Sequence, residues 1–160
     1  MRTYKHTDRQ FIDAVISECK ICFAGVIDEN GLPYVIPMNF GYHKGVFFLH
    51  SAPEGRAIRS LEKNNHICLT FSSGEELAWQ NADVACSYQM KAKSVVAEGR
   101  VTFIEDMELK RQALDYIMAQ YSDKSFNYGD PAVKNVKIWR VDVDNIGCKE
   151  FGARHDAYKK

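Results

Sequence analysis

Two tight turns within the first 50 residues constrain the fold of this chain most strongly. Asn30-Gly31 separates a strand-length apolar segment, Ile21 to Ile27, from a second one, Tyr34 to Tyr42. His43-Lys44-Gly45 then turns the chain into a third such segment, Val46 to His50. Because turns this short join antiparallel neighbours, the pattern predicts an antiparallel meander and argues against a parallel, doubly wound sheet.

The remaining sequence alternates between strand-length segments and helices. Helices are expected after Thr7 or Asp8, after Ser51-Ala52-Pro53-Glu54, which fits a capping box, and from Asp106 onward. About six mostly antiparallel strands with peripheral helices predict a single small β-barrel domain over residues 1–160, closed so that no strand edge is exposed. The further strands are expected at Ile67 to Phe71, Val84 to Lys91, Ser94 to Ile104 and Ile138 to Val143, with a connecting loop over Ser72 to Asp83.

Charge and hydropathy exclude several classes of partner. Lys plus Arg and Asp plus Glu number 21 each, so no net positive field attracts nucleic acid. No apolar run approaches the ~20 residues that span a bilayer, and the polar start, Met1 to Gln10, lacks the apolar core of a signal peptide. We therefore expect a cytoplasmic protein without a membrane or nucleic-acid partner. No Gly-x-Gly-x-x-Gly motif follows a strand, which argues against a Rossmann nucleotide site.

Cys19 and Cys22 form a Cys-x-x-Cys pair among the five cysteines of the chain. Such a pair acts in redox chemistry or supplies half of a zinc site, but no second pair follows at zinc-ribbon spacing. The alternative is that Cys19 ends a helix, Cys22 begins a strand, and both are small buried residues. No metal site is expected.

The junction between the strand ending at His50 and the following helix suits an anion. The unpaired N–H groups of a helix start, the Ser51 hydroxyl and the guanidinium of Arg56 or Arg59 together can hold a phosphate monoester. The alternative is that Ser51 only caps the helix and that both arginines are solvated. His50 itself either donates a proton or hydrogen bond, or is a core histidine bonded to a backbone carbonyl.

Two motifs carry a resemblance to a known family. They are Pro37-Met38-Asn39-Phe40-Gly41-Tyr42 and His50-Ser51-Ala52-Pro53-Glu54-Gly55-Arg56, supported by Cys86-Ser87-Tyr88, Ser94-Val95-Val96, Glu98-Gly99 and Ile138-Trp139-Arg140-Val141. From about Phe11 to Gly147 the chain resembles the pyridoxamine 5′-phosphate oxidase-like FMN-binding split barrels, and within them the nitroimidazole-resistance subgroup. The extra phosphate-binding residues typical of pyridoxamine phosphate oxidases are not recognisable, so that activity is not expected.

This resemblance implies a mainly β, six-stranded antiparallel split barrel that forms a homodimer with two FMN sites at the interface, FAD being the alternative cofactor. Pro37 to Phe40 would line the isoalloxazine ring, His50 and Ser51 would lie beside the ring and ribityl chain, and Arg56 would approach the phosphate. Lys93, Ser94 and Val95 would reach across from the partner subunit. The cofactor-binding residues implied are Pro37, Met38, Asn39, Phe40, His50, Ser51, Arg56, Lys93, Ser94, Val95 and Trp139.

Three functions remain open at this point. The first is a flavin-dependent reductase that passes electrons from a nicotinamide donor to a small electron-poor acceptor such as a nitroimidazole, with His50 or Tyr42 supplying a proton. The second is a flavin-binding module without turnover, and the third is a haem-binding split barrel with His50 or His66 as axial ligand. The stretch from Phe151 to Lys160 either caps the ligand site or frays.

Overall fold

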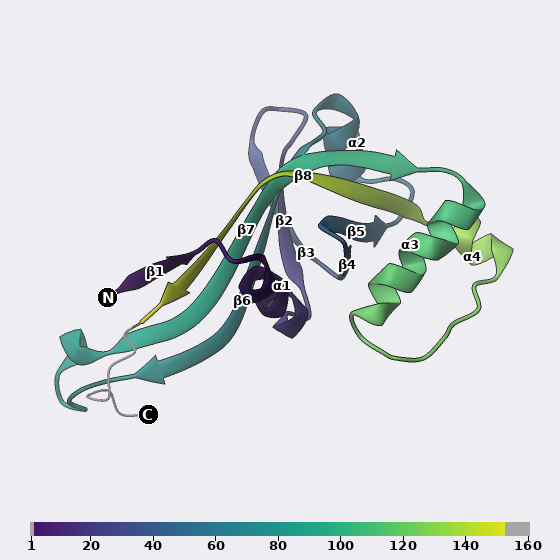
Figure 1. The fold of residues 1–160 in the computed structure, drawn as a ribbon. Helices are drawn as coiled ribbons and strands as arrows, with labels where there is room; N and C mark the ends of the chain where they lie inside the picture. The colour runs from purple at the N-terminus through teal and green to yellow at the C-terminus, as the bar shows by residue number, and fades with distance from the viewer. Residues whose placement is uncertain (1, 153–160) are drawn as a thin grey trace. The chain divides into compact units, whose positions relative to one another are not determined.

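The computed structural model describes residues 2–152 (Figure 1), so most of the C-terminal stretch considered above, residues 153–160, lies outside the described part. No helix in the described part is long and apolar enough to cross a membrane. The helices are α1 (Arg9–Glu18), α2 (Arg56–Lys63), α3 (Met107–Ala119) and α4 (Asp130–Lys134), with a 3-10 turn at Ala85–Ser87. The strands are β1 (Thr3–His6), β2 (Cys22–Ile27), β3 (Pro33–Met38), β4 (Phe40–His43), β5 (Val46–Ser51), β6 (His66–Ala78), β7 (Gln89–Ile104) and β8 (Lys137–Phe151).

The chain forms two compact units, and the long strands β6, β7 and β8 contribute residues to both. The larger unit, which we call the barrel unit, comprises residues 20–70 and 97–146. The smaller unit comprises residues 2–19, 71–96 and 147–152 of the described part. The prediction of a single domain over residues 1–160 stays a prediction.

In the barrel unit the strands follow the order β3-β2-β6-β7-β8-β5-β4. β2 pairs antiparallel with β6, with Ala24 opposite Leu69, and β5 pairs antiparallel with β8, with Leu49 opposite Trp139. The predicted segment from Tyr34 to Tyr42 is two strands instead of one, because the chain breaks at Asn39.

The sheet of the barrel unit is open, which corrects the prediction of a closed barrel. In residues 2–152 no pairing joins β3 to β4. At the break between them, the Phe40 amide donates to the Tyr121 hydroxyl (2.9 Å) instead of to a neighbouring strand. That hydroxyl donates in turn to the Lys20 carbonyl, also at 2.9 Å. The Tyr121 side chain, which follows the end of α3, therefore replaces the strand-to-strand hydrogen bond that the Phe40 amide would make if the barrel closed here.

Successive side chains of β4, β5 and β8 alternate between the two faces of the sheet. One face, which we call the inner face, carries five wholly buried side chains: Phe40, Phe47, Leu49, Trp139 and Val141. The opposite, outer face carries Phe48, which packs with Ala113 and Ile117 of α3. In Figure 1 the green helix α3 lies beside β4 and β5.

Gly41 is what lets α3 lie so close to the outer face. A Cβ atom at Gly41 would come within 2.5 Å of the backbone of Tyr116 and Ile117. The missing side chain therefore sets the distance between helix and sheet. The helix predicted from Asp106 is confirmed: Asp106 is the N-cap of α3, and its carboxylate accepts from the amides of Glu108 and Leu109.

The capping-box prediction at Ser51 is wrong. Ser51 is the last residue of β5, and α2 begins at Arg56 after Gly55, with no side chain capping its first turn. Gly55 has φ +146°, a backbone conformation that only glycine adopts without strain. The chain uses residues 52–55 to turn from strand into helix, which moves the helix start one turn later than the pattern predicts.

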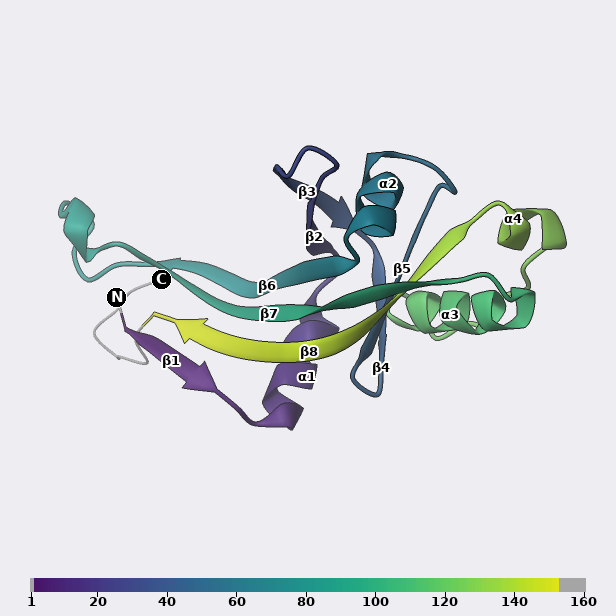
Figure 2. The ribbon, with the colours of Figure 1, turned by 90° about the horizontal axis from the view of Figure 1, so that it is seen from above.

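In the smaller unit α1 begins as predicted, with the Asp8 carboxylate accepting from the Phe11 amide at 2.8 Å. β1, which the sequence did not reveal, pairs antiparallel with the end of β8 (Figure 2). The loop predicted over Ser72 to Asp83 and the strand predicted from Val84 are both wrong in part: β6 continues to Ala78, and β7 begins only at Gln89. The hydrogen bonds that make residues 72–78 a strand come from the neighbouring strand β7, which the polar, glycine-containing pattern of this segment does not reveal.

Candidate functional site

The predicted ring-binding segment and His50 meet at one end of the barrel unit. β4 pairs with β5 so that Phe40 lies opposite Leu49. Continuing this register by one residue places Asn39 opposite His50. Pro37, Asn39 and His50 are exposed, whereas Met38 is half-buried. The structure thus brings the first motif beside the start of the second, where β3 and β4 part.

His50 retains part of its surface in solvent, yet the protein around the ring shields it enough to lower its pKa from the ordinary value of 6.5. The imidazole is therefore neutral near pH 7 and offers one N–H donor and one nitrogen acceptor. Its strand partner is Ile138, which belongs to the apolar cluster under α3. This places His50 on the outer face.

Tyr42, the other predicted proton donor, lies on the inner face. It pairs with Phe47, and the two rings are 4.6 Å apart. Phe47 and His50 are three positions apart on β5, so their side chains lie on opposite faces of the sheet. Tyr42 lies on the same face as its partner Phe47, and therefore on the face opposite His50. The two side chains do not converge on one site, and the catalytic role of each stays a prediction.

Ser51 and Trp139 are joined inside the barrel unit. The Trp139 indole N–H donates to the Ser51 hydroxyl at 3.1 Å, and that hydroxyl donates to the Ala52 carbonyl at 2.8 Å. Trp139 and Phe40 are both 0% exposed. These two predicted cofactor residues are therefore buried beneath the candidate site and do not line its surface. Trp139 holds the Ser51 side chain in place at the end of β5.

Arg56 extends over the turn that joins β2 to β3. Its Nη2 donates to Asp28 at 2.5 Å, and its guanidinium lies over the Tyr34 ring, 4.3 Å from the centroid. The amide of Leu32 and the Arg56 guanidinium hold the pKa of Asp28 below its usual range. Asp28 and Tyr34 thus position Arg56, and sequence reasoning missed both because they lie more than 20 positions away.

Tyr121 is a second residue that sequence reasoning missed. Its hydroxyl links the Lys20 carbonyl to the Phe40 amide. No local pattern signals such a link, because the hydroxyl and the amide are 81 positions apart. Tyr121 orders the chain at the Asn39 break, beside His50.

The remaining predicted cofactor residues, Lys93, Ser94 and Val95, belong to the smaller unit. Lys93 Nζ lies 3.4 Å from a carboxylate oxygen of Glu18, and Val95 is wholly buried. Ser94 is half-buried. Their proposed contribution to a site across a subunit interface stays a prediction.

The Cys-x-x-Cys pair is structural. Cys19 follows the last residue of α1, Cys22 begins β2, and both are buried. The Cys19 thiol donates to the carbonyls of Val15 and Ser72, each at 3.2 Å, and burial raises its pKa to about 11. A thiol in that state is a poor nucleophile and metal ligand. Among the described residues, no group of three or more His, Cys, Asp or Glu could hold a metal ion.

Comparison with known proteins identifies the family. A proposed 5-nitroimidazole antibiotic resistance protein from Bacteroides thetaiotaomicron is 48% identical, with a TM-score of 0.85 over 94% of this chain and 89% of that one. A flavocytochrome from Azotobacter vinelandii (21% identity, TM-score 0.79, 93% and 70% covered) has the same fold. So has an FAD- and haem-binding protein from Mycobacterium smegmatis (14%, 0.83, 95% and 75%). No curated protein matches the chain.

These matches confirm the predicted fold class, an antiparallel split barrel with peripheral helices. They also agree with the resemblance to the nitroimidazole-resistance subgroup. Residues 9–148 match the family described as pyridoxamine 5′-phosphate oxidase, and this chain belongs to that family.

Proposed function

We propose that this chain binds FMN and is a reductase that passes electrons from a nicotinamide donor to small electron-poor acceptors such as nitroimidazoles. The observation that carries the proposal is the β5–α2 junction, where Ser51, an uncapped helix start and Arg56 follow one another. The 48% identity with a proposed nitroimidazole resistance protein supports the class of acceptor.

The junction fits a phosphate monoester. The first turn of α2 has no side-chain cap, so its N–H groups point toward the loop and suit an anion. Gly55, with φ +146°, has no neighbouring atom within 4 Å of the place of a Cβ. Arg56 binds Asp28 through Nη2, and a guanidinium has five N–H donors, so donors remain for phosphate oxygens.

The residues beside the junction fit a planar ring. Pro37, Met38 and Asn39 would line the ring, held by the link from Phe40 to Tyr121. A bound flavin supplies the two-electron redox chemistry. His50, neutral at pH 7, would hold or move a proton at a ring nitrogen, whereas Tyr42 faces the other side of the sheet.

We propose a homodimer with the cofactor sites at the interface, completed by Lys93, Ser94 and Val95 of the partner. The support is an apolar stripe on the exposed side of β2 and β3, where Phe23, Ile27 and Val35 are 44%, 43% and 59% exposed. A groove of about 500 Å³ runs beside Ile27 and Val35. Exposed apolar surface of this kind marks protein–protein contacts.

The first experiment is the absorption spectrum of the purified protein, with chromatography of any released chromophore. We expect flavin bands and FMN, and FAD would correct the cofactor. A Soret band would favour haem, and a colourless protein that takes up neither FMN nor FAD overturns the proposal. Anaerobic NADH or NADPH with metronidazole should then reoxidise the flavin in an acceptor-dependent way; tight flavin binding without donor oxidation would indicate a module without turnover.

The role of Arg56 is tested with riboflavin, which lacks the phosphate. We expect Arg56→Ala to weaken FMN binding by roughly tenfold or more and to leave riboflavin binding unchanged, because charge-assisted hydrogen bonds contribute about 1.5–3 kcal/mol. Arg59→Ala is the matched control, since Arg59 lies on the same helix and pairs with Glu29. Equal losses for FMN and riboflavin would show that Arg56 acts on the fold.

The dimer is tested by light scattering after size-exclusion chromatography. Val35→Asp should convert the dimer to monomer, because a carboxylate would be buried in the apolar stripe. Leu109→Asp is the control, since Leu109 is similarly exposed but lies on α3, outside the apolar stripe. A wild-type monomer, or a Val35→Asp protein that remains dimeric, contradicts the proposed interface.

A further inference from the structure

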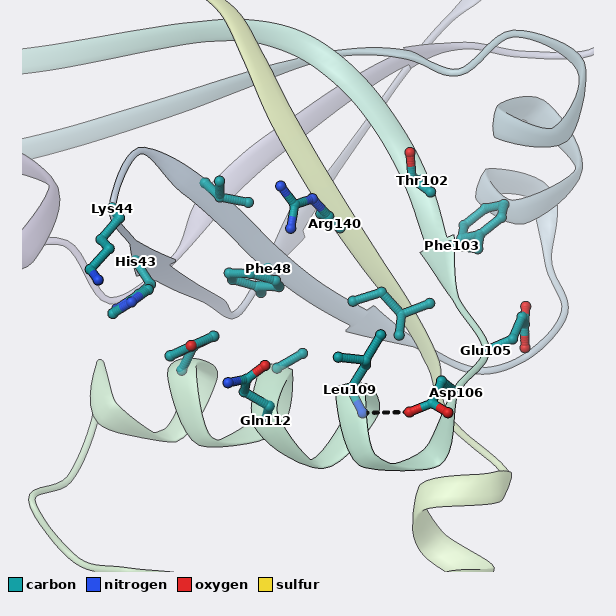
Figure 3. Close-up of a pocket in the computed structure, with 14 residues that line it drawn as sticks. His43, Lys44, Phe48, Thr102, Phe103, Glu105, Asp106, Leu109, Gln112 and Arg140 are labelled. Atoms are coloured by element: carbon teal, nitrogen blue, oxygen red, sulfur yellow. Dashed lines mark hydrogen bonds between the residues drawn. The ribbon is translucent and has the colours of Figure 1, made fainter.

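A second cavity lies in the barrel unit between α3 and the outer face of β5 and β8. It is a groove of about 520 Å³, and its lining includes none of the predicted cofactor residues. Figure 3 shows Phe48 and Arg140 on the sheet side, with Leu109 and Gln112 on α3. The volume lies within the range of small-molecule sites.

One wall of this α3 groove is aromatic. The rings of His43 and Tyr116 stack with centroids 4.2 Å apart and planes at 10°, and Tyr116 lies 5.0 Å from Phe48. The stacking holds the Tyr116 ring in place beside Phe48. Three adjoining rings form a surface on which a further planar ring can pack.

The two cationic side chains of the groove, Lys44 and Arg140, differ in their ion pairs. Arg140 is held by Asp142 through Nε and Nη2. Lys44, by contrast, makes no ion pair with an acidic residue in the described part of the chain. The acids of the groove are occupied: Glu105 binds Lys137, and Asp106 caps α3. An anion in the groove would therefore be attracted toward Lys44, since the charge of Arg140 is compensated by Asp142.

Lys44 is also conformationally strained. Its φ is +48°, and within residues 2–152 it is the only non-glycine residue with positive φ. Gly45 follows with φ +88°, so the two residues form the kind of tight turn in which Asn or Gly usually occupies the first position. Backbone strain of this kind is retained preferentially at functional sites.

We propose that the α3 groove binds a small aromatic carboxylate, with its ring against Phe48 and Tyr116 and its carboxylate at Lys44. The aromatic wall accounts for the ring, and the Lys44 ammonium, which has no ion-pair partner among residues 2–152, accounts for the acid group. This ligand is distinct from the flavin, because it uses other residues on another part of the outer face.

The test compares benzoate with its neutral analogue benzamide by calorimetric titration of FMN-saturated protein. Benzoate is expected to bind about tenfold more tightly than benzamide, as a charge-assisted contact predicts. Lys44→Asn should remove that difference, whereas Lys44→Arg should keep it. Lys149→Asn, an exposed lysine of the smaller unit, should behave like wild type.

The position of the ligand is tested separately by filling the groove. Gln112→Trp should abolish benzoate binding while leaving the flavin spectrum and the melting temperature unchanged, since Gln112 is exposed on α3. Three results overturn the proposal: no saturable binding at millimolar benzoate, equal affinity for benzoate and benzamide, or benzoate affinity unaffected by both Lys44→Asn and Gln112→Trp.

Discussion

The two faces of β4, β5 and β8 are built from the same strands and have opposite characters. The inner face carries Phe47, Leu49 and Trp139, all wholly buried, and its polar contact is the Trp139–Ser51 hydrogen bond. The outer face is covered by α3 over Phe48 but leaves His50 at one end and Arg140 beside a groove. Two-residue alternation thus assigns stability to one side and exposed chemistry to the other.

A small sheet can thus carry a binding site on one face without weakening the core packed on the other. Polar and titratable groups on the outer face contact solvent or α3, so they do not interrupt inner-face packing. The cost of substitution should therefore differ between adjacent residues of one strand.

The largest effect is expected from Trp139→Ala, which should lower the free energy of unfolding by about 3–5 kcal/mol, because it opens a cavity in the inner face and leaves Ser51 without its donor. Urea denaturation at fixed protein concentration measures it. Arg140→Ala, one residue along the same strand, is the outer-face control. An equal loss of unfolding free energy in Arg140→Ala and Trp139→Ala would contradict the proposed difference between the two faces.

Gly41→Ala should cost about 1–3 kcal/mol, because the added Cβ would overlap the backbone of α3 and force the helix away from the sheet. Gly147→Ala is the matched control in another strand, where no atom lies within 4 Å of the added carbon. Thermal unfolding of both variants gives the difference. An unaffected Gly41→Ala protein would mean that α3 is not held at this distance.

Lys44→Asn should raise the free energy of unfolding by roughly 0.5 kcal/mol, because Asn tolerates positive φ better than Lys does. Such a gain in unfolding free energy would show that Lys44 costs the protein stability at this position. Denaturant unfolding of Lys44→Asn and Lys44→Arg compares the two. A destabilised Lys44→Asn protein would show that Lys44 makes contacts that outweigh its strain.

The smallest effect is expected from His50 and appears only with pH. Because the pKa of His50 is lowered in the folded protein, the unfolded chain binds the proton more readily below pH 6.5. Its contribution is therefore fully present above pH 6.5 and is lost as pH falls from there to the folded pKa. Unfolding of His50→Gln and wild type at pH 8 and pH 5 should agree at pH 8 and diverge at pH 5; parallel profiles would contradict the shift.

Much of the local structure could be predicted. The Asn30-Gly31 turn, the helix caps at Asp8 and Asp106 and the early antiparallel strands follow from patterns spanning a few residues. The predictions failed where the signal was not local. The polar, glycine-containing end of β6 resembled a loop, because its hydrogen-bonding partners lie on a different strand, β7.

The candidate site shows the same division. The motif around His50 and Arg56 was evident in the sequence, but Asp28 beneath Arg56 and Tyr121 behind Phe40 were not. Each of these contacts joins residues far apart along the chain. Spacing within one element carries no information about them.

The sequence by itself determined the strand alternation, the turn positions, the two well-capped helices and the family motifs, because these depend on backbone preferences and side-chain spacing within a few residues. Only the tertiary structure decided that the sheet stays open at Asn39, that Tyr42 and His50 face opposite sides, and that α3 leaves a groove beside Lys44. Those outcomes depend on strand register and on the close approach of α3 at Gly41, which arise when distant segments pack together.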